Sequence, residues 1–193
     1  RNRTRTESVT TVDSLAGSEA DTLHFAKAVD LVESGARDWE AILKIDPSNQ
    51  IAVNNLVNAM LTSGFYSLRM GRIGDTLRQY RAALAVERQA KPSAMIGSTL
   101  SIPAIGLVAV EADLGNRQAA EAALAEYERL NEMGFRDLPA DSFGRGMLRE
   151  FGAFGLAPLA RYAIPVAAGD YATVREKARA SLQRSEAVKP ADS

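Results

Sequence analysis

Three places in the chain share one pattern: a long amphipathic segment, a glycine, a polar residue and a second amphipathic segment. The pattern occurs at Gly71-Arg72, Gly115-Asn116 and Gly169-Asp170. A glycine between two helices can adopt the positive φ that ends the first helix without strain. Because a single helical hairpin cannot bury all of its apolar surface, repeated hairpins stack against their neighbours. The pattern therefore predicts stacked antiparallel helical hairpins.

Helical periodicity covers most of the sequence, and no segment has the alternation that is typical of a strand. The fold class that follows is all-α. We expect one helix to end at Gly35, a short helix over 39–45, and Ser48 to cap the helix that ends at Gly71. The main interruption is expected from Met133 to Gly146, where three glycines and Pro139 occur.

The chain divides into three parts by composition. Residues 1–12 are polar and have no helical period, so we expect a flexible lead-in. Residues 13–186 are expected to form one helical domain, followed by a flexible tail over 187–193. Because the sequence begins with Arg1 and not with Met, we interpret it as part of a longer protein.

Equivalent positions after the three glycines predict how each hairpin packs. Five residues after each glycine the side chain is small or β-branched, which allows two helices to approach closely: Thr76, Ala120 and Val174. Nine residues after each glycine lies a predicted core position in the middle of the helix: Tyr80, Leu124 and Ala178.

Residues 46–89 resemble the tetratricopeptide repeat family. Gly64 lies at the family's first-helix glycine, Gly71 at its turn glycine, Tyr80 at its large second-helix aromatic and Ala83 at its small packing residue. The segment Ile45-Asp46-Pro47 is similar to the element between repeats, and a weaker resemblance extends to about residue 130. The resemblance implies a right-handed superhelix of stacked hairpins.

The chain also departs from the family pattern. Thr76 stands where the family usually has alanine. The turn glycines lie 44 residues apart (71 to 115) and 54 residues apart (115 to 169), whereas the family repeat is about 34 residues long. Longer first helices would account for this spacing. The alternative is an irregular helical bundle that shares only the chemistry of its turns.

The resemblance implies a concave groove that is lined by side chains of the first helices and binds a protein or peptide segment. By this analogy the groove residues are Asn54, Asn58, Leu61, Phe65, Ile102, Ile105 and Ala109. Asparagine side chains at such positions can hydrogen-bond the backbone of a bound peptide. The alternative is that the apolar members of this set belong to the core.

Residues with catalytic or metal-binding chemistry are few. The chain has no cysteine and a single histidine, His24, so a multi-histidine or thiolate metal site is excluded. The carboxylate pairs Glu111–Asp113 and Asp137–Asp141 have ordinary explanations at helix ends and in loops. The glycine-rich segment 142–155 lacks the strand and the lysine of a phosphate loop, but its Arg145 and Arg149 could pair with an acidic partner.

These features predict a non-catalytic interaction module, without cofactor or metal, of a larger bacterial signalling or regulatory protein. The alternative is a sensory domain with a small-ligand pocket, built from the long first helices and residues 133–165. A net charge of −1 argues against nucleic acid as a partner, and no apolar run approaches the length of a membrane span. The absence of cysteine is compatible with an extracytoplasmic location, and the oligomeric state is left open.

Overall fold

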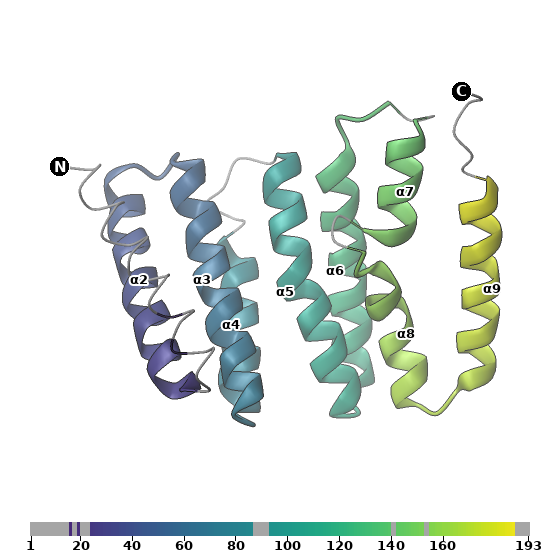
Figure 1. The fold of residues 1–193 in the computed structure, drawn as a ribbon, viewed down its shortest axis with the longest axis horizontal. Coiled ribbons are helices and arrows are strands. Elements are labelled where there is room, and N and C mark those ends of the chain that lie inside the picture. Colours follow the sequence, from purple (N-terminus) through teal and green to yellow (C-terminus); the bar gives the residue numbers. More distant parts are fainter. Residues whose placement is uncertain are drawn as a thin grey trace. The chain divides into compact units, whose positions relative to one another are not determined.

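The computed structural model describes residues 16, 19, 24–86, 93–139, 142–152 and 155–187. All regular secondary structure in these ranges is helical, as the sequence predicted (Figure 1). The contacts group the chain into two compact units, residues 1–91 and 92–193. The predicted lead-in and the tail beyond Ala187 lie outside the described residues.

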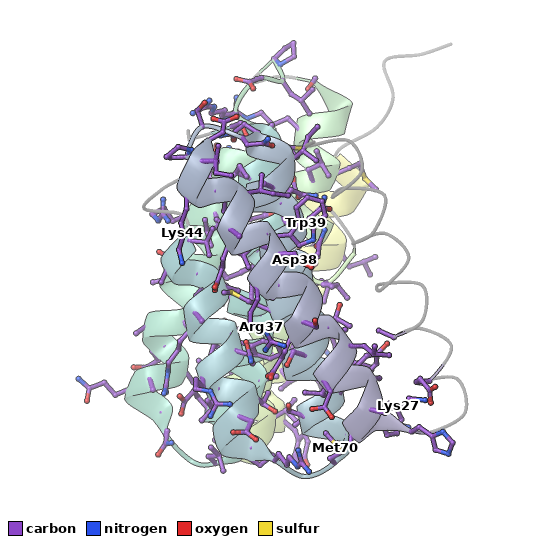
Figure 2. The ribbon with its side chains drawn as sticks, turned by 90° about the vertical axis from the view of Figure 1, so that its left-hand side faces the viewer. Lys27, Arg37, Asp38, Trp39, Lys44 and Met70 are labelled. Carbon is purple, nitrogen blue, oxygen red and sulfur yellow. The ribbon has the colours of Figure 1, made fainter. Side chains whose placement is uncertain are left out.

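In the described part of unit 1, α2 (Phe25–Ile45), α3 (Gln50–Arg69) and α4 (Ile73–Ala85) follow one another in sequence. The middle helix, α3, packs against both α2 and α4. Figure 2 looks onto α2, with Lys27 near one end of this helix and Lys44 near the other. The core side chains of the unit come from all three helices and include Val32, Trp39, Ile42, Val53, Leu56, Val57, Tyr80 and Ala83.

Two local predictions for unit 1 are wrong. The helix expected to end at Gly35 continues through this buried glycine to Ile45, because apolar packing on both sides outweighs the cost of about 1 kcal/mol for a glycine inside a helix. The cap of α3 is Asn49, whose side chain accepts a hydrogen bond from the Ala52 amide at 3.0 Å. The hydroxyl of Ser48 instead donates to the Asp46 carboxylate at 2.8 Å.

Five helices occur in the residues of unit 2 that the structure describes: α5 (Ala94–Asp113), α6 (Arg117–Phe135), α7 (Phe143–Phe151), α8 (Ala157–Ala167) and α9 (Tyr171–Ala187). The central helix is α5, which packs against both α6 and α8. It continues through Pro103 as one helix and is capped by Ser93, which accepts a hydrogen bond from the Ile96 amide at 3.2 Å.

The composition of α5 differs from what we expected. We expected no segment apolar enough to span a membrane, yet α5 is long and apolar enough by these two criteria. In the structure, 61% of its most apolar 18-residue window is buried. Packing against both α6 and α8 explains why this helix is apolar almost all round, as is typical of a core helix.

The three glycine turns have the same backbone geometry. Gly71, Gly115 and Gly169 have φ values of 72°, 75° and 69°, which is the positive φ that the sequence predicted. Each glycine amide donates to the carbonyl three residues earlier, at 2.9, 3.0 and 3.0 Å respectively. The next amide donates to the carbonyl five residues earlier, at 2.9, 2.9 and 2.8 Å. These paired bonds define a Schellman motif, so α3–α4, α5–α6 and α8–α9 turn in the same way.

The hairpin of α3 and α4 is closely packed at Gly64. A Cβ atom on this glycine would lie 2.4 Å from Cε1 of Tyr80, so only hydrogen fits there. The Thr76 hydroxyl, which is fully buried, lies 3.1 Å from the carbonyl oxygen of Gly64 and 3.2 Å from that of Arg72. A threonine is therefore accommodated at this crossing because its hydroxyl has acceptors on both helices.

The helices α5 and α6 approach each other most closely at the end of their hairpin that lies away from the turn at Gly115. A Cβ atom on Gly97 would lie 2.6 Å from the Gly134 nitrogen and 2.8 Å from the Leu130 carbonyl oxygen. A Cβ atom on Gly134 would in turn lie 2.8 Å from the Ser98 hydroxyl. The backbones of α5 and α6 are thus in direct contact, and both glycines are needed for it.

The third hairpin does not follow the predicted register. The prediction that Ala178 lies in the core is wrong, because this residue is exposed. Val174, expected at the close approach of the two helices, is only half-buried. In the other two hairpins Thr76, Ala120 and Tyr80 are buried, while Leu124 is half-buried. The turn at Gly169 is therefore the same, but the helix that follows it lies on the surface of unit 2.

Candidate functional site

One face of α3 carries the four groove residues that the sequence placed in unit 1. Together with two flanking residues they form what we call the α3 stripe, with alternating spacings of three and four residues: Ile51, Asn54, Asn58, Leu61, Phe65 and Leu68. The exposed fractions of Ile51, Phe65 and Leu68 are 67%, 49% and 36%. Asn58 is exposed, and Asn54 and Leu61 are half-buried. Neither α2 nor α4 covers these apolar side chains.

An aromatic group lies at one end of the stripe. The ring centroids of Phe65 and Tyr66 lie 5.9 Å apart, and those of Tyr66 and Phe25 lie 5.8 Å apart. The guanidinium carbon of Arg69 lies 5.7 Å from the centre of the Phe25 ring. These contacts link α3 to the start of α2 and limit the movement of the ring that Phe65 presents to solvent.

The predicted groove residues of unit 2 lie on α5 in different environments. Ile105 is 8% exposed and belongs to the core. Ile102 is half-buried and Ala109 is exposed. Of the three predicted groove residues on α5, therefore, Ile102 and Ala109 present surface to a partner and Ile105 does not.

A hollow that the sequence did not suggest lies between α2 and α4. It has a volume of about 680 Å³, and α3 forms its floor with Leu56 and Met60. Two small side chains on α4, Ala82 and Ala85, leave this space open. These alanines are the feature of the sequence from which the hollow could have been predicted. Its remaining lining residues are Glu40, Leu43, Lys44, Pro47 and Val86.

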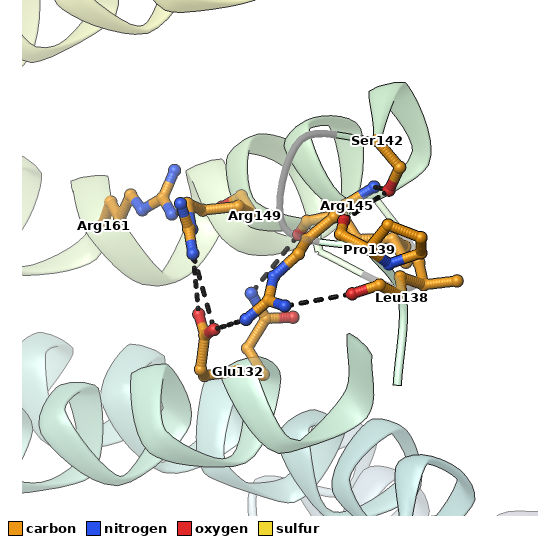
Figure 3. A network of polar contacts seen from close by, with 9 residues as sticks. Glu132, Leu138, Pro139, Ser142, Arg145, Arg149 and Arg161 are labelled. Carbon is orange, nitrogen blue, oxygen red and sulfur yellow. Dashed lines mark hydrogen bonds and ion pairs between the residues drawn. The ribbon is translucent and has the colours of Figure 1, made fainter. Parts of the chain in front are cut away.

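Arg145 and Arg149 have an acidic partner within the chain. Arg145 donates to the Glu132 carboxylate at 2.6 Å and to the Leu138 carbonyl at 3.0 Å, and Arg149 reaches Glu132 at 3.4 Å (Figure 3). Both guanidinium groups also lie over the Phe135 ring, 5.7 and 6.0 Å from its centre. The two arginines thus connect α7 to the end of α6, and this structural role explains their spacing.

A second polar network is centred on a buried carboxylate that the sequence analysis missed. The side chain of Glu150, on α7, is 7% exposed. Arg184 donates to its two oxygens at 2.8 and 3.2 Å, and Ser181 also donates to it. Arg161 donates to the backbone carbonyl of Glu150 at 2.8 Å. Burial raises the pKa of Glu150, but the hydrogen bonds from Arg184 and Ser181 outweigh this effect and hold the pKa below its ordinary value.

The other candidates for chemistry are not assembled into a site. His24 is exposed and lies 3.1 Å from the Glu19 carboxylate. Glu111 is buried and accepts a hydrogen bond from Asn116 at 2.9 Å, whereas Asp113 is exposed. Asp137 is exposed, and its predicted partner at position 141 lies outside the described residues. In the part of the chain that the structure describes, no group of three potential metal ligands occurs.

One buried hydroxyl in unit 2 has no hydrogen-bond partner. The Tyr127 side chain on α6 is 1% exposed, and among the described residues nothing pairs with its oxygen. A Cβ atom on Gly152 would lie 2.8 Å from this oxygen, so the ring reaches the backbone after α7. Burial, reinforced by the nearby Glu128 carboxylate, raises the pKa of Tyr127 to about 12 in spite of the opposing charge of Arg161.

Tyr127→Phe is expected to stabilise the protein by about 1 kcal/mol, because it removes a buried polar atom that is unpaired.

The raised pKa of Tyr127 also means that folding opposes ionisation of this phenol. The free energy of unfolding is therefore unaffected by this ionisation below pH 10, and it falls as the pH rises from 10 towards about 12. Chemical denaturation at pH 7 and pH 11 tests both points, with Tyr171→Phe, at an exposed tyrosine, as the control. A destabilising Tyr127→Phe substitution would show that the hydroxyl has a partner in solution.

No protein-family model matches the sequence, and the comparisons with curated proteins and with solved structures found no match either. The resemblance to tetratricopeptide repeats therefore stays a prediction based on the residues quoted above.

Proposed function

We propose that the chain is a non-catalytic interaction module of a larger signalling or regulatory protein, and that it binds a protein or peptide segment along the α3 stripe. The observation that carries this proposal is the exposure of Ile51, Phe65 and Leu68 on one face of a single helix. Single exposed apolar residues are common on protein surfaces, but exposed apolar side chains that are neighbours on one helix face, as Phe65 and Leu68 are, are typical of an interaction site.

The spacing of the stripe suits an amphipathic helix as the bound segment. Apolar residues that alternate at intervals of three and four along one helix are the ones that meet a second helix in a seam. The side chains of Leu61, Phe65 and Leu68 supply the apolar part of this seam. The exposed amide of Asn58 supplies a polar contact that would fix the register of the bound segment. The same hairpin turns that resemble tetratricopeptide repeats hold α3 in position.

The hollow between α2 and α4 shares no residue with the α3 stripe, and its open shape argues against the alternative function of a small-ligand sensor. Its volume of about 680 Å³ is within the range of ligand pockets. However, its rim residues Glu40, Lys44, Pro47 and Ala85 are exposed. The hollow is therefore an open furrow, whereas a small-ligand sensor needs a site that encloses most of its ligand.

A photo-crosslinking analogue of phenylalanine at position 65 of the full chain tests the proposal. We expect it to capture a defined partner protein, identified by mass spectrometry, while the same analogue at the exposed position of Gln118 on α6 does not. Phe65→Ala is expected to weaken binding of that partner by about 10-fold or more, because a large apolar side chain that becomes buried in an interface contributes strongly to affinity. Crosslinks from position 65 that lead only to residues of the same chain would overturn the proposal.

A further inference from the structure

The last helix, α9, is attached to unit 2 in an unusual way. It extends over 17 residues, from Tyr171 to Ala187, yet none of its described side chains, at positions 171–184, is buried. Thr173, Val174, Ala180 and Ser181 are half-buried and mark the face that points to the unit. Helices usually stay docked by burying an apolar face, whereas at the described positions of α9 this face has two apolar side chains, Val174 and Ala180.

The buried carboxylate of Glu150 supplies the attachment that apolar packing does not. It accepts hydrogen bonds from Arg184, at 2.8 and 3.2 Å, and from Ser181, which lie one turn apart on α9. On its other side, Glu150 has Arg161 of α8, which lies 3.5 Å from Oε1 and also donates to its backbone carbonyl. A carboxylate of α7 therefore connects α8 to α9.

Release of α9 would leave no charge buried without a partner. Glu150 would keep Arg161 of α8, and water could hydrate the oxygens that Arg184 and Ser181 now contact. Arg184 is already 57% exposed, so little desolvation is reversed at its guanidinium group. The free energy of detaching α9 is thus set mainly by a few charge-assisted hydrogen bonds. Detaching a core helix would also expose a large apolar area.

We infer that α9 is a latch helix, which separates from α7 and α8 as one segment while α5 and α6 stay folded. The hydrogen bonds to Glu150 hold it in its docked position. The hinge is the turn at Gly169, which ends α8 with its own hydrogen bonds and so does not depend on the docking of α9. Opening would uncover a cavity of about 210 Å³ that α9 closes from one side. Its fixed walls are formed by Leu124, Glu128, Arg161 and Tyr162 of α6 and α8.

Hydrogen–deuterium exchange of the full chain, followed by mass spectrometry, tests this inference. In the unmodified protein the amides of α9 should exchange faster than those of α5 and α6, because local release is less costly than global unfolding. Glu150→Gln and Arg184→Gln each remove one charge from the ion pair that connects α7 to α9. Each should accelerate exchange in α9 by roughly 10- to 100-fold and leave α5 and α6 unchanged.

The matched control is Arg179→Gln, which removes the same charge from an exposed position of the same helix. It should leave the exchange of α9 unchanged. The inference fails if α9 is as protected as α6 in the unmodified protein, or if Arg184→Gln and Arg179→Gln have equal effects. It also fails if Arg184→Gln accelerates α5 and α6 together with α9, because α9 would then unfold only with the whole unit. Glu150→Gln alone could disturb the core, whereas Arg184 is largely exposed and avoids this ambiguity.

Discussion

Gly97→Ala is expected to destabilise the protein by about 3 kcal/mol or more, the upper end for overpacking a close contact. The new methyl group would lie 2.6 Å from the Gly134 nitrogen and 2.8 Å from the Leu130 carbonyl oxygen. These are backbone atoms of α6, so no side-chain rotation can relieve the clash and the two helices must separate. The gain of about 1 kcal/mol that alanine usually brings to a helix interior is far too small to compensate.

Urea denaturation monitored by circular dichroism measures this effect. Gly144→Ala is the matched control in the same unit, because a Cβ atom there would meet only the Leu138 side chain at an ordinary distance of 3.8 Å. We expect this control to be neutral or slightly stabilising. A Gly97→Ala protein as stable as the control would show that α5 and α6 are farther apart in solution than in the structure.

Gly64→Ala is expected to cost about 2 kcal/mol in unit 1, again through overpacking. Its methyl group would lie 2.4 Å from Cε1 and 2.7 Å from Cδ1 of the Tyr80 ring. This clash is with a side chain, but the ring is only 4% exposed and is therefore held in place by its neighbours. The expected cost is thus smaller than at Gly97 but still clear. Gly74→Ala, where no atom lies within 4 Å of the new methyl group, is the control.

A double-mutant cycle makes the explanation specific. Tyr80→Leu alone should destabilise the protein because it leaves a cavity beside Gly64. Combined with Gly64→Ala, it should recover about 1–2 kcal/mol relative to the sum of the two single effects, since the methyl group would occupy part of that cavity. Strictly additive effects would mean that Gly64 is required for another reason, such as its carbonyl contact with Thr76.

The all-α fold and the three turns could be predicted because their causes are local in sequence. Gly71, Gly115 and Gly169 each end one helix and begin a hairpin through hydrogen bonds within six residues. The same local reasoning failed at Gly35, where the burial of residues on both sides of the glycine decides the outcome. A glycine in a helical pattern ends the helix only if tertiary packing does not continue beyond it.

The polar networks could not be predicted because they join residues that are far apart in sequence. Glu150 and Arg184 are separated by 34 positions, and Glu132 and Arg145 by 13. Nothing in the local sequence indicates which of many charged residues will pair. Four members of the α3 stripe, in contrast, could be named in advance from the resemblance to tetratricopeptide repeats: Asn54, Asn58, Leu61 and Phe65. Whether a periodic apolar residue faces core or solvent depends on packing, as the burial of Ile105 and the exposure of Phe65 show.

The arrangement of unit 1 has a consequence for how the protein acquires its structure. Its principal helix contacts, α2 with α3 and α3 with α4, join elements that are consecutive in the chain. Such a low contact order requires only short loops to close, which favours rapid folding. Because its internal contacts come from the first 91 residues, unit 1 can fold at the ribosome before the glycine contact between α5 and α6 has been synthesised.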